Sequence, residues 1–158
     1  MAAEIERRFL LANDDWRSEV THVEHFRDGL IARFGGGKLR VRKALDRAWI
    51  TIKGQRVGIS RSEFEYEIPM ADAEEMLLTL CEGPVVEKAR HFVPYGGLMW
   101  SIDVHEGLLA GVVFAEVELT TEDQAVKTPP WIGQEITHDP AYKKQALFKR
   151  AAGWTGAV

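Results

Sequence analysis

The chain has 158 residues, 46% of them hydrophobic, which predicts one domain over residues 1–158 with a buried core. Twenty Lys and Arg against 24 Asp and Glu give a net charge of −4, which argues against general affinity for nucleic acid or an anionic membrane. The single cysteine excludes an internal disulfide, and neither a signal segment nor a membrane-length apolar run is present, so we expect a cytoplasmic protein.

The N-terminal pattern is Glu4-Ile5-Glu6-Arg7-Arg8-Phe9-Leu10-Leu11. Side chains alternate between the two faces of a strand, so Glu4, Glu6 and Arg8 share one face and the apolar residues share the other. Hard divalent cations prefer carboxylate oxygens, and phosphate oxygens prefer arginine. This face therefore suits a site that holds a cation beside a polyanion.

Further strands joined by turns follow along the chain. Alternating or apolar patterns predict strands at 21–34, 38–45, 48–53, 61–68, 85–93, 98–104 and 112–119. Helical spacing is expected over 71–78, a capping-box helix start at 121–124, and a last helix from Asp139-Pro140 to about Ala151. Strands joined by turns or short helices favour an antiparallel sheet. We predict an α+β, mainly β fold in which eight antiparallel strands close into a barrel.

Charged residues gather on one face of these strands. By alternation that face carries Glu4, Glu6, Arg8, Arg40, Arg42, Thr51, Lys53, Arg61, Glu63, Glu65, Lys88, Arg90, Ser101, Asp103, Glu116 and Glu118. One interpretation is the solvated outer face of an ordinary sheet. Neighbouring like charges, as in the repeated Glu-x-Glu, are destabilising unless opposite charge lies between them. We therefore favour a barrel interior lined by seven acids and seven bases, with helices packed on its apolar outside.

At these residues the chain resembles the CYTH superfamily, the triphosphate tunnel metalloenzymes. The resemblance runs from end to end and is closest to the short bacterial members that hydrolyse inorganic tripolyphosphate. One such motif would be weak, but six occur in the family's order: Glu4 to Leu10, Leu39 to Arg42, Thr51 to Gly54, Arg61 to Ile68, Val86 to Arg90, and Phe114 to Leu119.

The resemblance implies a closed tunnel, Mg²⁺ or Mn²⁺, with two ions expected, and a small-molecule triphosphate substrate. Glu4, Glu6 and Glu118 would hold the first ion, while Glu63, Glu65 and Glu116 would support a second ion or position the attacking water. Asp103 would orient an arginine or a metal-bound water. The phosphate chain would be bound by Arg8, Arg40, Arg42, Lys53, Arg61, Lys88 and Arg90.

Hydrolysis at a terminal phosphorus by metal-activated water is the implied reaction. Lys53 and Lys88 are candidate catalytic residues because they alone among the lining cations can change protonation, and Glu63 and Glu65 join them as candidates. Three alternatives stay open: a class IV adenylate cyclase, a thiamine or nucleoside triphosphatase, and a module that binds polyphosphate or nucleotide without turnover. A lipid-carrying barrel is disfavoured because such interiors are apolar. The protein could be a monomer or a homodimer.

Two positions depart from the family pattern. Arg8 stands where the family has Lys; it keeps the charge and gains bidentate geometry, but it cannot deprotonate. The segment 22–26 lacks the usual Gln-x-Tyr, a difference to which the sequence assigns no consequence. The five histidines show no metal-ligand spacing and are expected to be structural or solvated. Tyr142 is expected either to pack in the core or to plug one end of the tunnel.

Overall fold

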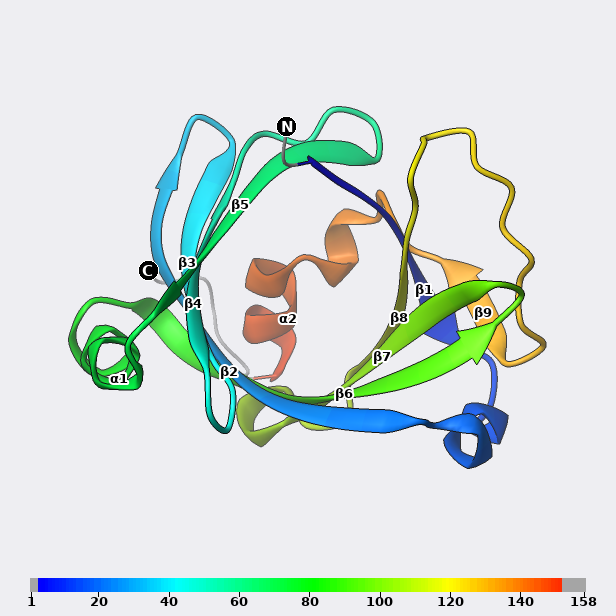
Figure 1. The fold of residues 1–158 in the computed structure, drawn as a ribbon, viewed down its shortest axis with the longest axis horizontal. Coiled ribbons are helices and arrows are strands. Elements are labelled where there is room, and N and C mark those ends of the chain that lie inside the picture. Colours follow the sequence, from blue (N-terminus) through cyan, green and yellow to red (C-terminus); the bar gives the residue numbers. More distant parts are fainter. Residues whose placement is uncertain (1–2, 152–158) are drawn as a thin grey trace.

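The computed structural model describes residues 3–151 as a ring of strands with a few helices (Figure 1). The strands are β1 (Ala3–Leu11), β2 (His22–Phe34), β3 (Gly37–Lys43), β4 (Ala48–Lys53), β5 (Ser60–Ile68), β6 (Glu82–Tyr95), β7 (Leu98–Glu106), β8 (Val113–Glu118) and β9 (Ile132–Glu135). The helices are α1 (Met70–Thr79) and α2 (Lys144–Ala151), with short 3-10 turns at Asp15–Glu19, Gly107–Leu109 and Pro140–Tyr142. The predicted class, mainly β with few helices, is confirmed.

The sheet closes on itself through β1. Its order is β5-β4-β3-β2-β6-β7-β8-β1-β9, and β1 also pairs with β5. Every pairing between named strands is antiparallel. Phe9 pairs with Ala115 of β8 and with Glu135 of β9, so β9 continues the edge of β1 that β5 occupies at Ala3 to Ile5. The predicted closed ring of eight antiparallel strands is confirmed, with β9 as an addition.

The outer face of the ring carries two apolar clusters. Trp16, Trp100 and Trp131 pack together over β1, β7 and β8, and α1 covers β3 by placing Ala73 and Leu77 against Val41. The prediction that helices cover the apolar outside holds only in part, because Phe64 is 40% and Tyr66 58% exposed on β5.

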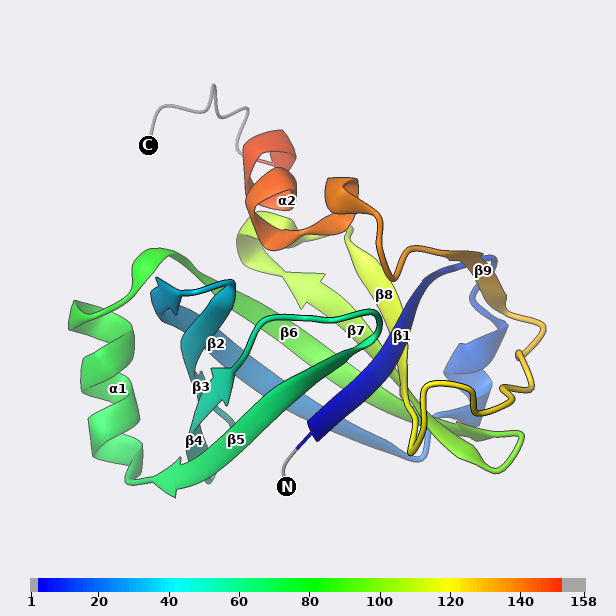
Figure 2. The same cartoon turned by 90° about the horizontal axis from the view of Figure 1, so that it is seen from above.

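Helix α2 lies across one end of the ring instead of along its outside (Figure 2). In the view down the ring axis it stands within the outline of the strands (Figure 1). Leu147 packs with Phe114, and Phe114 makes an edge contact with Tyr142 at 5.9 Å. The prediction of helices packed only outside is therefore wrong for α2, and Tyr142 belongs to the apolar layer that closes this end.

Two other local predictions differ from the structure. No helix follows Thr121: the Gln124 side chain accepts hydrogen bonds from Thr120, and Pro129 and Pro130 follow too closely for a helix to continue. The predicted last helix is interrupted at Lys143, whose ψ of 150° is extended, so only a single turn follows Asp139 before α2 begins. Neither described helix meets the length and hydropathy required to span a membrane.

Candidate active site

The predicted charged face points into the ring. Across neighbouring strands, Glu4 pairs with Arg61, Arg8 with Glu116, Lys53 with Glu63, and Arg90 with Asp103. The interior is not a solvated surface, since six of its charged residues are less than 9% exposed: Glu4, Glu6, Asp28, Arg42, Lys88 and Asp103. The alternative of an ordinary outer sheet face is therefore wrong.

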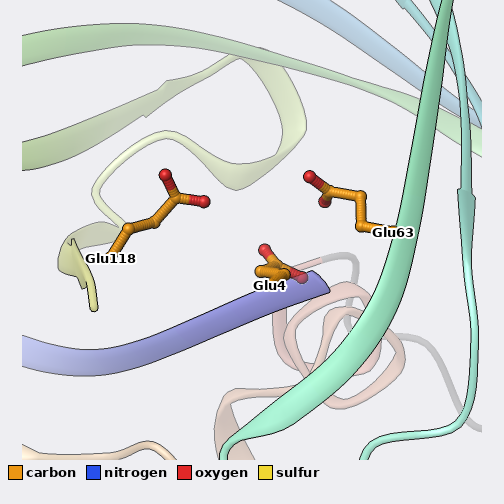
Figure 3. A group of neighbouring side chains, drawn as sticks. All are labelled: Glu4, Glu63 and Glu118. Carbon is orange, nitrogen blue, oxygen red and sulfur yellow. The ribbon is translucent and has the colours of Figure 1, made fainter. Parts of the chain in front are cut away.

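Three glutamates from different strands form a candidate cation site. Glu4 on β1, Glu63 on β5 and Glu118 on β8 each offer a carboxylate oxygen, and these oxygens all lie within 4.8 Å of one another. Figure 3 shows the three carboxylates directed toward one another. Burial, with Glu4 and Glu63 nearby, raises the pKa of Glu118. A divalent cation would remove this repulsion, and all-oxygen donors fit Mg²⁺ or Mn²⁺.

Lys53 lies beside this group. Its Nζ is 3.0 Å from Glu4 Oε1 and 3.2 Å from Glu63 Oε2. Burial would raise the pKa of Glu4, but the Lys53 ammonium outweighs it and lowers the pKa. Lys53 thus stabilises the charged form of Glu4 and places a positive charge beside Glu63, at the point where both meet Glu118.

Glu6 and Glu116 form a second acidic pair deeper in the ring. Burial, followed by the charges of Glu116 and Glu4, raises the pKa of Glu6 to about 9. Glu116 behaves in the opposite way, because Arg8, 2.9 Å away, and Arg90 outweigh its burial and hold its pKa well below the ordinary value. The pair therefore shares one proton near neutral pH in the absence of a cation. The resemblance grouped Glu6 with Glu4 and Glu118, whereas the geometry groups Glu63 with them.

The middle of the ring is held by buried ion pairs. Arg90 donates to both oxygens of Asp103 at 2.7 and 2.9 Å, and Lys88 Nζ lies 2.8 Å from the same carboxylate. Both Asp103 oxygens are thus engaged by cations, and Asp103 is outside the three-glutamate group. This geometry favours its expected role as an arginine-orienting group over that of a metal ligand.

Three predicted site residues, Glu65, Arg61 and Arg40, make few close ionic contacts. Glu65 is exposed and accepts a hydrogen bond from Thr51 at 2.9 Å, apart from the three-glutamate group. Arg61 is 3.9 Å from Glu4, and Arg40 is 3.8 Å from Asp28. The Nε atoms of both arginines are buried without a hydrogen-bond partner in the described part of the chain, so both retain donor capacity for an anion.

The sequence prediction missed several interior residues: Asp28, Lys38, Arg56, His105 and Lys144. Asp28 accepts a bidentate pair from Arg42 at 2.7 and 2.8 Å, and Arg42 holds its pKa well below the ordinary value despite burial. Burial, reinforced by Lys53 and Arg40, lowers the pKa of Lys38 to about 7. Alternation within β2, β3 and β7 would have found Asp28, Lys38 and His105, because they continue the faces of Phe26, Arg40 and Asp103. The sequence carries no such signal for Arg56, which reaches Glu6 from a loop.

Aromatic rings support three of the interior guanidinium groups. Arg42 lies 4.2 Å and Arg90 5.5 Å from the ring centroid of Phe26, and Arg8 lies 5.2 Å from that of Phe114. Stacking on a ring fixes the plane of a guanidinium group while leaving its edge donors free. The segment 22–26, to which the sequence assigned no consequence, thus supplies a platform for two phosphate-binding candidates.

The comparisons with known proteins agree over almost the full chain. The CYTH domain family matches residues 2–151. An inorganic triphosphatase of Acetivibrio thermocellus is 42% identical over 94% of this chain and 95% of its own. One of Nitrosomonas europaea is 38% identical, covering 91% and 95%. A solved inorganic triphosphatase structure matches with a TM-score of 0.64 at 35% identity, covering 91% of this chain and 96% of its own.

Proposed function

Because this chain belongs to the CYTH domain family, we propose that it is a metal-dependent hydrolase that cleaves the terminal phosphoanhydride of inorganic triphosphate. The observation that carries the proposal is the convergence of Glu4, Glu63 and Glu118 within 4.8 Å beside interior cations. Such a site brings a divalent cation and a polyphosphate into contact without any covalent role for the protein. The substrate is a small molecule, and the proposed cofactor is Mg²⁺ or Mn²⁺.

Glu4, Glu63 and Glu118 would hold one ion, and Glu6 with Glu116 would support a second once their shared proton is lost. The ions would neutralise phosphate charge and acidify a bound water, which is the chemistry that hydrolysis needs. Glu65, which lies apart from these acids and accepts a hydrogen bond from Thr51, remains a candidate for positioning the water. Lys53 contacts both Glu4 and Glu63 and keeps Glu4 ionised, so that Glu4 is available to a cation.

The phosphate chain would be bound by the interior cations. Arg40 and Arg61 have unused Nε donors, so they would gain the most from an incoming phosphate. Arg8, Arg42 and Arg90 are held by Glu116, Asp28 and Asp103, an arrangement that orients their remaining donors before the substrate arrives. Lys88 completes the set beside Asp103.

Steady-state release of phosphate from inorganic triphosphate, ATP and thiamine triphosphate with Mg²⁺ or Mn²⁺ tests the proposal. Inorganic triphosphate should be the preferred substrate. Glu65→Gln and Glu118→Gln should each lower turnover roughly 100-fold, since about 3 kcal/mol of charge stabilisation is at stake. Glu67→Gln is the matched control, because Glu67 lies on β5 in an exposed pair with Arg47. Tight binding of triphosphate without turnover by the wild type would reject hydrolysis in favour of a binding module.

A further inference from the structure

Lys144, the first residue of α2, brings a cation into the ring from outside the strands. Its Nζ lies 2.9 Å from Nε2 of His105, which shares the inward face of β7 with Asp103. The charged groups that act most strongly on Lys144 come from four strands: Lys88, Arg8, Asp28 and Asp103. Lys144 is partly buried, and its Nζ contacts His105 on the inward face of β7.

The hydrogen bond from Lys144 supplies no counter-charge. His105 Nδ1 lies 2.9 Å from the Val112 carbonyl, which can only accept, so Nδ1 carries the hydrogen and Nε2 accepts from Lys144. Burial, reinforced by Lys144, lowers the pKa of His105 to about 4. The partner of Lys144 is therefore a neutral ring at physiological pH.

Several features disfavour a charge on Lys144 when no ligand is present. No carboxylate of residues 3–151 forms an ion pair with it, unlike Lys88, which pairs with Asp103. Lys144 also stands at the N-terminal end of a helix, where the helix dipole is positive. Burial, followed by the charges of Lys88 and Arg8, lowers its pKa to about 7. These three features indicate that the anionic partner of Lys144 is a ligand and not a residue of the described chain.

We propose that Lys144 is a phosphate-binding residue that contacts the substrate chain from the end of the ring covered by α2. The inference rests on the proposed function and adds to it a cation that none of the strands supplies. Arg8 and Lys88 are the cations that act most strongly on Lys144, but they already have Glu116 and Asp103 as partners. A phosphate oxygen entering between them would be the first anionic partner of Lys144, and its binding would tie α2 to the substrate.

Kinetics of Lys144→Met and Lys144→Gln test the contact, with Lys143→Met as the control because Lys143 is the adjacent, exposed lysine. A hydrogen bond to a charged group contributes about 1.5–3 kcal/mol, so both Lys144 variants should raise the KM for triphosphate roughly 10- to 150-fold. Lys144→Arg should recover part of the loss. The smallest rise in KM expected from this contact is about tenfold. A KM within about twofold of wild type in both neutral variants would therefore overturn the proposal.

Stability without turnover separates this role from simple packing. In EDTA and without ligand, Lys144→Met should melt higher than wild type, because it removes a charge that lacks a counter-charge. Added triphosphate should raise the melting temperature less in the variant, and in the wild type it should slow amide exchange in α2. A lower melting temperature with an unchanged triphosphate shift would assign Lys144 to packing alone. Because these measurements need no hydrolysis, they decide the question even where wild-type turnover is absent and the proposed function fails.

Discussion

Replacing Asp103 by Asn tests whether the interior is organised by buried ion pairs. Asp103 is 2% exposed and engages Arg90 through both oxygens and Lys88 through one. Asn keeps the shape but removes the charge and turns an amide donor toward cationic donors. Within residues 3–151, Lys88, 6% exposed, would then keep only its ion pair with Asp28, at 3.7 Å.

Removing one partner of a buried pair costs about 3–5 kcal/mol, because the other charge stays buried without compensation. An unfolding entropy of about 2.1 cal/mol/K per residue gives roughly 0.33 kcal/mol/K for this chain. Asp103→Asn should therefore lower the melting temperature by about 9–15 °C in the absence of ligand. Triphosphate should raise the melting temperature of the variant more than that of the wild type, because the variant interior has one more uncompensated positive charge.

Differential scanning fluorimetry with and without triphosphate measures both effects, and Asp46→Asn in the exposed β3–β4 turn is the matched control. A shift of less than about 2 °C, well short of the 9–15 °C estimated above, would refute the ion-pair reasoning. Metal titration separates the two roles expected for Asp103: an unchanged apparent affinity for Mn²⁺ with a lower kcat fits an arginine-orienting group. A weakened Mn²⁺ affinity would instead make Asp103 a metal ligand.

Three further changes probe the core, the acidic pair and the N-terminal strand. Leu77→Ala in α1 should lower the free energy of unfolding, measured by chemical denaturation, by about 2–5 kcal/mol without changing kcat. Leu78 is 85% exposed, so Leu78→Ala should lower it little. Equal losses of unfolding free energy in the two variants would contradict the packing. A folded pKa of about 9 for Glu6, against 4.5 unfolded, gives stability that is present at low pH and lost as pH rises through about 9. In EDTA, Glu6→Gln should therefore be more stable than wild type at pH 9, and its unfolding free energy should depend less on pH. Parallel curves of unfolding free energy against pH for the two proteins would reject the shared proton. Arg8→Lys keeps the charge but loses stacking on Phe114, so its KM for triphosphate should rise less than about tenfold. Arg8→Met also loses the charge, so its KM should rise more. An equal rise in KM for both variants would show that geometry outweighs charge.

Local alternation was sufficient to identify the charged inner face. Side chains in a strand alternate with a period of two whatever the strand's neighbours are, so Glu4, Glu6 and Arg8 had to share a face. The same rule placed Arg40 with Arg42, and Glu116 with Glu118. Turn-linked strands also fixed the antiparallel pairing, and the family resemblance supplied the closed ring.

The sequence could not decide which acid meets which base. Glu4, Glu63 and Glu118 converge only because β1 pairs with β8 on one edge and with β5 on the other. Asp103 alternates correctly, yet alternation did not show that it would pair with Arg90 and Lys88, which lie on the adjacent strand. These outcomes depend on strand order and register, which are properties of the closed sheet.

The C-terminal segment shows the same limit most clearly. Its sequence predicted a helix, but whether that helix packs outside the ring or across its end depends on how the apolar side chains of Leu147 and Tyr142 fit against Phe114. Only that packing brings Lys144 to His105. The sequence by itself thus determined the chemistry of the interior, because alternation is local, whereas the tertiary structure decided the partners, because contacts between distant segments are set by closure and packing.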